Sequence, residues 1–220
     1  MDWKIFIGLS DVYMPLITLI LFIAIKKYIP RKENLLFAYL LLNVITFIIT
    51  DIMLVYKIHN SVIYHFYSLL ELCILIPYLK SFLHNTKLSK TGGEVIVLYF
   101  VFWMLNIFLW EPLDTFNSYG AATSNLIILI SCLYNMLQLA KRDEVLYFQR
   151  TPAFWIISGF LFSSAINIMV FASYKYYTLN KIDGRMIWLI SSFATIIKFV
   201  LISVGLLWYK PRQSIQHLLL

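Results

Sequence analysis

Seven long apolar stretches, separated by short polar connections, run along this chain. They lie near residues 11–28, 34–56, 61–83, 95–112, 117–139, 153–174 and 186–209. A helix needs about 20 mostly apolar residues to cross the hydrocarbon core of a bilayer, and each stretch reaches or nearly reaches that length. Residues that favour turns stand between the stretches at Pro30, Gly92, Gly93, Pro112, Pro152 and Gly184. The pattern predicts an all-α polytopic membrane protein, in which residues 1–220 form a single seven-transmembrane-helix bundle.

The composition supports a membrane environment. Of the 220 residues, 61% are hydrophobic and 13% are charged, and that charged share is about half of what a soluble domain carries. We therefore expect the lipid bilayer to surround the protein. A net charge of +7 could indicate nucleic-acid binding, but nucleic-acid-binding proteins gather their basic residues on one face. Here the charges form short groups between apolar stretches, so we expect no nucleic-acid partner.

The distribution of Lys and Arg predicts the orientation of the helices. Positive residues accumulate in the cytoplasmic connections of membrane proteins. Of the eighteen Lys and Arg, twelve lie in the first, third and fifth connections and the tail, five lie on the opposite side, and Lys198 lies within a stretch. The twelve are Lys26, Lys27, Arg31, Lys32, Lys80, Lys87, Lys90, Lys141, Arg142, Arg150, Lys210 and Arg212. We expect the N-terminus outside and the C-terminus inside.

Catalytic and metal-binding motifs are absent from the sequence. Cys73 and Cys132 both lie inside apolar stretches, and the spacing offers no CxxC pair. Of the four histidines only His65 falls within a stretch, which argues against a three-histidine zinc site. No GxSxG, HExxH, DxxxD or Walker motif occurs. We therefore expect no enzymatic activity, no metal and no other cofactor.

Two opposite charges lie deep within apolar stretches. Counted from the start of their stretches at 1.5 Å per residue, Glu71 lies roughly 15 Å deep and Lys198 roughly 18 Å deep. Both depths are close to the middle of a bilayer, where an ionisable side chain is costly and by default indicates a functional site. The similar depths allow an ion pair, either direct or through water.

Polar residues recur at helical spacing around these two charges. Ser68 precedes Glu71 on one face of its stretch, and Thr195 precedes Lys198 on another. Such faces point into the bundle because lipid offers no hydrogen bonds, and they predict a polar cavity opening outward. Asn and Ser also act as packing contacts between membrane helices, which is the competing interpretation. The candidate ligand or ion-pair residues are Glu71, Lys198, Asp51, His65, Tyr64, Tyr67, Ser68, Asn106, Asn125, Asn167 and Thr195.

These observations leave three functions open. The first is a sensor or receptor-like protein that binds a small molecule or an ion in the cavity. The second is an ion- or proton-coupled transporter, in which Asp51, His65 and Glu71 form a relay. The third is a retinal-binding photoreceptor, since the topology, a lysine in the last helix and an acid in the third resemble microbial rhodopsins. This resemblance implies retinal at Lys198, but Ala194 stands four residues earlier, where an acid is expected.

Two short motifs resemble small seven-helix integral membrane proteins of Bacteroidota-type bacteria. They are Tyr67-x-x-x-Glu71 in the third stretch and Trp208-Tyr209-Lys210-Pro211 at the end of the last. The resemblance implies a multi-pass protein of the bacterial inner membrane with a signalling role. Because the tail from Gln213 to Leu220 is too short for an effector domain, we expect a separate cytoplasmic signalling partner. The sequence leaves the oligomeric state open.

Overall fold

The protein is helical throughout its described parts. The computed structural model describes residues 3–83, 86–141, 151–180 and 184–209, and within these ranges no strand occurs. The seven α-helices are α1 (Trp3–Ala24), α2 (Asn34–Val55), α3 (Ser61–Lys80), α4 (Thr86–Leu109), α5 (Ser118–Ala140), α6 (Pro152–Leu179) and α7 (Arg185–Leu207). The predicted all-α class is confirmed. The predicted Lys210-Pro211 motif and the tail from Gln213 to Leu220 lie outside the described residues.

The observed helices extend beyond several of the predicted stretches. α4 begins at Thr86 rather than near residue 95, and α6 continues to Leu179 rather than residue 174. Hydropathy marks only the lipid-crossing part of a helix, whereas polar turns at the headgroup level prolong it. α6 begins at Pro152, close to the predicted start near residue 153. Thr151 caps this end by accepting a hydrogen bond from the Phe154 amide, and proline is favoured in the first turn of a helix.

Within the described residues, six helices are long and apolar enough to cross a membrane. They are α2 to α7, and α1 contributes a shorter described apolar stretch from Tyr13 to Ala24. This finding supports a multi-pass membrane protein. The seventh crossing and the orientation of the termini stay predictions.

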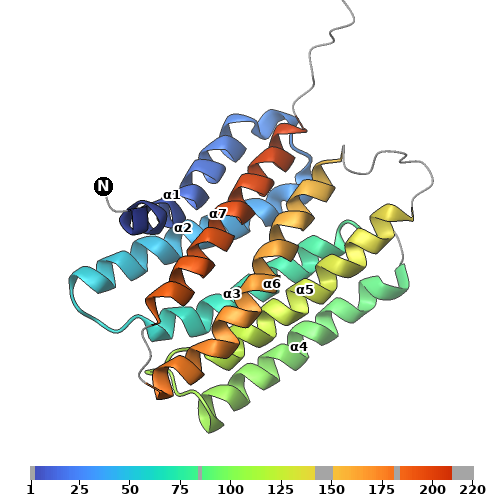
Figure 1. Cartoon of the computed structure of the whole chain (residues 1–220). Helices are drawn as coiled ribbons and strands as arrows, with labels where there is room; N and C mark the ends of the chain where they lie inside the picture. Colours follow the sequence, from blue (N-terminus) through green and yellow to red (C-terminus); the bar gives the residue numbers. More distant parts are fainter. Residues whose placement is uncertain (1–2, 84–85, 142–150, 181–183, 210–220) are drawn as a thin grey trace, which may run out of the picture.

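The helices form a ring with one helix outside it. α1, α2, α3, α5, α6 and α7 pack in that order, and α7 packs back against α1 (Figure 1). α4 lies outside this ring, against α3 and α5. α3 and α7 are therefore not neighbours in the ring, and their inward faces meet across its interior.

The ring has two unlike ends. At the base end, where α2 begins and α3 and α7 finish, a cluster of buried apolar side chains fills the interior. Tyr39 and Phe160 meet edge to face in this cluster with ring centroids 5.1 Å apart. At the mouth end, where α2 and α6 finish and α3 and α7 begin, the interior is lined mainly by polar side chains. The apolar base holds the helices together and leaves the polar residues gathered at the mouth.

A buried carboxylate ties the base end together. Glu33, just before α2, has no exposed surface. Its Oε2 accepts a hydrogen bond of 2.6 Å from Tyr78 of α3, and its Oε1 accepts one of 2.6 Å from Tyr209 beyond α7. Burial, and then the nearby Glu33 carboxylate, raise the pKa of the Tyr209 phenol above its ordinary value. This Glu33 clamp joins three parts of the chain.

Two glycines bring α6 and α7 close together. A Cβ atom on Gly159 would lie 2.8 Å from the Lys198 carbonyl oxygen, and one on Gly205 would lie 2.6 Å from Cγ1 of Ile156. Small residues at such contacts let membrane helices approach closely. The Gly159 contact sets the position of α7 at the level of Lys198.

We expect Tyr209→Phe to lower the free energy of unfolding by about 1–3 kcal/mol, because a buried carboxylate oxygen loses a donor. Because the pKa of Tyr209 is higher in the folded state, its contribution to stability is fully present below about pH 10. At higher pH the Tyr209 phenol ionises first in the unfolded state, and this contribution is lost. The variant should therefore also lose less stability above that pH. Thermal unfolding in detergent across pH measures both effects. Tyr56→Phe, at a 72% exposed side chain, is the control and should behave as wild type.

We expect Gly159→Ala to destabilise the protein by about 1–3 kcal/mol, because the added methyl group overlaps the backbone of α7. The matched control is Gly93→Ala in α4, where a Cβ meets nothing within 4 Å. Alanine is the better helix former, so the control should be neutral or gain up to about 1 kcal/mol. Equal unfolding temperatures for the two variants would contradict close packing at Gly159.

Candidate functional site

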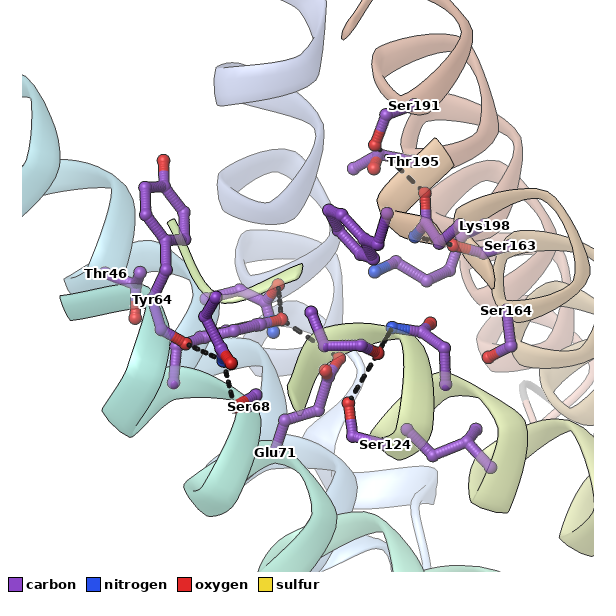
Figure 2. A pocket seen from close by; sticks show the side chains of 18 of the residues that line it. Thr46, Tyr64, Ser68, Glu71, Ser124, Ser163, Ser164, Ser191, Thr195 and Lys198 are labelled. Carbon is purple, nitrogen blue, oxygen red and sulfur yellow. Dashed lines mark hydrogen bonds between the residues drawn. The ribbon is translucent and has the colours of Figure 1, made fainter. Parts of the chain in front are cut away.

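A cavity of about 200 Å³ occupies the mouth half of the ring. Side chains from α2, α3, α5, α6 and α7 line it, together with the connection between α4 and α5 (Figure 2). Leu75, Ile128 and Phe160 form its floor, where it meets the apolar base. The cavity therefore lies inside the helix ring, between the packed base and the mouth.

Glu71 projects from α3 into this cavity. Its side chain is 8% exposed. Oε1 accepts hydrogen bonds from the Tyr67 hydroxyl at 3.0 Å and from the Tyr39 hydroxyl at 3.4 Å. The Tyr67 hydroxyl also lies 3.0 Å from Oδ1 of Asn43. Because a phenol has one hydroxyl hydrogen, Tyr67 must share it between two acceptors, and this wall of the cavity is rich in acceptors.

Lys198 reaches the same cavity from α7 (Figure 2). Its side chain is 6% exposed. The ammonium nitrogen lies 4.8 Å from the centre of the Phe199 ring and 5.6 Å from the centre of the Tyr39 ring. Aromatic faces attract cations at such distances. Lys198 is also close enough to Glu71 for their opposite charges to attract each other, and Tyr39 contacts both.

The wall between α6 and α7 is a short polar chain. Asn167 donates from Nδ2 to Oγ of Ser163 at 3.3 Å, and Ser191 donates from Oγ to Oδ1 of Asn167 at 2.9 Å. Thr195 lines the cavity one turn before Lys198. These groups offer hydroxyl and amide contacts beside the charged pair.

Asn117 forms part of the opposite wall. Its Nδ2 donates to Oγ of Ser68 at 2.8 Å, which ties the connection before α5 to α3. Its Oδ1 is buried and has no hydrogen-bond partner among the described residues. This acceptor packs against Gly120 at the start of α5, and a buried acceptor without a donor costs free energy.

Aromatic rings surround Phe116 at the mouth of the cavity. Its ring centre lies 4.2 Å from that of Tyr174, 5.2 Å from that of Trp188 and 6.2 Å from that of Tyr64. The Phe116 connection is held in place from behind, because His65 Nε2 hydrogen-bonds the Thr115 carbonyl at 3.1 Å. The rings give the mouth an apolar rim over a polar interior.

Most predicted site residues meet at this cavity, and three lie elsewhere. Asp51 is exposed on α2, His65 is buried against the connection before α5, and Asn106 donates to Oε2 of Glu111 at 3.0 Å. The direction in which each of these three side chains points was not predicted from the sequence. The predicted residues that line the cavity are Glu71, Lys198, Tyr64, Tyr67, Ser68, Asn125, Asn167 and Thr195.

Several site residues were missed by the sequence interpretation. Tyr39 contacts both Glu71 and Lys198, Asn43 accepts a hydrogen bond from Tyr67, and Thr46 also lines the cavity. These three recur at i, i+4 and i+7 on α2, so a polar stripe was visible there too. Phe116 and Asn117 carried no such signal, because they lie in a connection whose path only the fold determines.

Among the described residues, no three His, Cys, Asp or Glu side chains gather closely enough to hold a metal ion. The arrangement places a carboxylate, an ammonium group and neutral hydrogen-bonding groups around one small volume. Comparison of the chain with protein-family models, curated proteins and solved structures finds no match.

Proposed function

We propose that the protein is a receptor-like or sensor component of a membrane that binds a small polar molecule or an ion in this cavity. The observation that carries the proposal is the meeting of Glu71 and Lys198, which are 8% and 6% exposed, at one volume of about 200 Å³. That volume is below the roughly 300–1,000 Å³ typical of pockets for drug-sized ligands. A small charged or zwitterionic molecule fits this size and chemistry.

The Glu33 clamp shows how this fold buries a charge for structure alone. Both Glu33 oxygens receive phenol donors at 2.6 Å, and the side chain lies in the packed base. Glu71 differs, because it borders the cavity and only its Oε1 receives the phenol hydrogen bonds of Tyr67 and Tyr39. Burying charges costs several kcal/mol unless they are well compensated. A ligand that donates a hydrogen bond to Glu71 adds to its compensation.

The predicted orientation turns the mouth of this cavity to the outside, in a bacterial inner membrane. A ligand bound there would alter the contacts between α3 and α7 through Tyr39, which touches Glu71 and Lys198. Both helices run from the mouth to the base. We propose that a cytoplasmic partner binds at the base end, beside the positively charged connections, and responds to this change.

Thermal stabilisation by small solutes tests the proposed site. Wild-type protein in detergent is heated with sodium, potassium, acetate, ethylammonium or glycine. A solute that binds at 100 times its Kd stabilises the folded state by about 2.7 kcal/mol. We expect Glu71→Gln to abolish the response to a cationic or zwitterionic solute, and Lys198→Met the response to an anionic or zwitterionic one.

Two control variants remove charges that do not border the cavity. Asp51→Asn removes an exposed carboxylate on α2, and Lys141→Met removes an exposed ammonium group after α5. Both should retain the wild-type response. A solute that stabilises wild type and both cavity variants equally would show that its site lies elsewhere, and the assignment of Glu71 and Lys198 would then be wrong.

Transport is the second candidate, and the closed floor of the cavity favours it. A cavity bounded by packed apolar residues at one end corresponds to one of the two states that alternating access requires. Reconstitution into proteoliposomes with an imposed pH gradient separates the two functions. A sensor should leave proton flux at the level of empty liposomes, whereas a transporter should show flux that Glu71→Gln removes and Asp51→Asn does not.

A further inference from the structure

A second cavity lies outside the helix ring, at the base end between α3, α4 and α5. Its volume is about 220 Å³. α3, α4 and α5 run side by side there (Figure 1), and α4 packs less extensively on α5 than on α3. Ile130 lines this cavity and is 57% exposed on the outer surface of the bundle. The cavity therefore borders the lipid-facing surface and is separate from the cavity that Glu71 and Lys198 share.

Its position along the helices is that of lipid headgroups. Lys80 is the last residue of the apolar segment of α3, and Gly92 follows a mostly polar run in the sequence, Thr86-Lys87-Leu88-Ser89-Lys90-Thr91. Both line the cavity. Hydrocarbon thus gives way to the polar layer at this level, where phosphates attract Lys and Arg side chains.

Lys80 gives the cavity a cationic wall. A Cβ atom on Gly92 would lie 2.6 Å from the Lys80 ammonium nitrogen, so glycine leaves the room that this side chain occupies. The remaining lining includes apolar side chains of Ile76, Leu79 and Val95. An ammonium group beside apolar walls matches a phosphate followed by acyl chains.

Asn135 adds a requirement of the opposite kind. The residue is 3% exposed and lines the cavity, and its Nδ2 already donates to the Ser131 carbonyl at 2.8 Å. Its Oδ1 is buried and has no hydrogen-bond partner among the described residues. A buried acceptor of this kind is satisfied by an N–H or O–H donor. A ligand that carries both a phosphate and a hydrogen-bond donor would therefore complement this cavity.

We infer that this cavity binds a phospholipid whose headgroup carries a hydrogen-bond donor, as in phosphatidylethanolamine or phosphatidylglycerol. The phosphate contacts Lys80, the headgroup N–H or O–H donates to Asn135, and an acyl chain follows the apolar wall past Ile130. Phosphatidylcholine offers the phosphate without a donor, and diacylglycerol offers a hydroxyl without the phosphate. These two lipids separate the contributions of Lys80 and Asn135.

Lipid retention in native mass spectrometry tests the inference on the full-length protein. The protein is incubated with each of the four lipids, all carrying the same acyl chains. We expect the ethanolamine and glycerol lipids to be retained about fivefold better than phosphatidylcholine, as one additional hydrogen bond gives. Asn135→Leu should abolish that preference. Lys80→Met should lower retention of all three phospholipids about tenfold, as loss of a hydrogen bond to a charged group gives.

Two further variants complete the experiment. Lys141→Met removes an exposed charge at the same end of the bundle and should retain lipids as wild type does. Gly92→Leu fills the space beside Lys80 without removing a polar group, and it should lower phospholipid retention even if Asn135→Leu fails to fold. Equal retention of phosphatidylcholine and phosphatidylethanolamine by wild type would overturn the inference, as would equal losses in Lys80→Met and Lys141→Met. The outcome is independent of any solute response at the first cavity.

Discussion

The absence of hydrogen-bonding solvent within a bilayer is the constraint on which this structure depends. Each polar side chain on a membrane-crossing helix must find a partner inside the protein or line a water-filled space. In this chain the polar groups of five helices turn toward one interior, where the Tyr67 hydroxyl lies within hydrogen-bonding distance of both Glu71 and Asn43. The helix ring is therefore arranged around its polar residues as much as around its apolar core.

The same constraint explains why the two ends of the ring differ. The base buries Glu33 by giving both oxygens a phenol donor and filling the space around it with apolar side chains. The mouth half keeps an open volume beside Glu71 and Lys198. The base is therefore held together by apolar packing, whereas the mouth half is held by hydrogen bonds around an unfilled volume.

Local patterns predicted the helices and most of the cavity residues, since both follow from periodicity. Glu71, Ser68 and Thr195 line the cavity, on the inward faces that helical spacing predicted. The packing order was beyond these patterns: hydropathy is the same for a helix inside the ring and for α4 outside it. For that reason Asn106 on α4 could be assigned a depth but not a side, and it bonds Glu111 instead. The Glu33 clamp was not predicted because Tyr78 and Tyr209 are far from Glu33 in the sequence.

The place of α4 determines how many sites the fold can hold. Because α5 rather than α4 completes the ring beside α3, the first cavity is enclosed by α5 residues such as Asn125 and Ile128. α4 then covers the outer sides of α3 and α5, and its glycine at position 92 accommodates Lys80. The placement of α5 in the ring and of α4 outside it thus closes the interior cavity and creates the second cavity at the lipid boundary. A helix joined mainly to α3 can shift against α5 without opening the ring, so occupation of the outer cavity need not perturb the inner one.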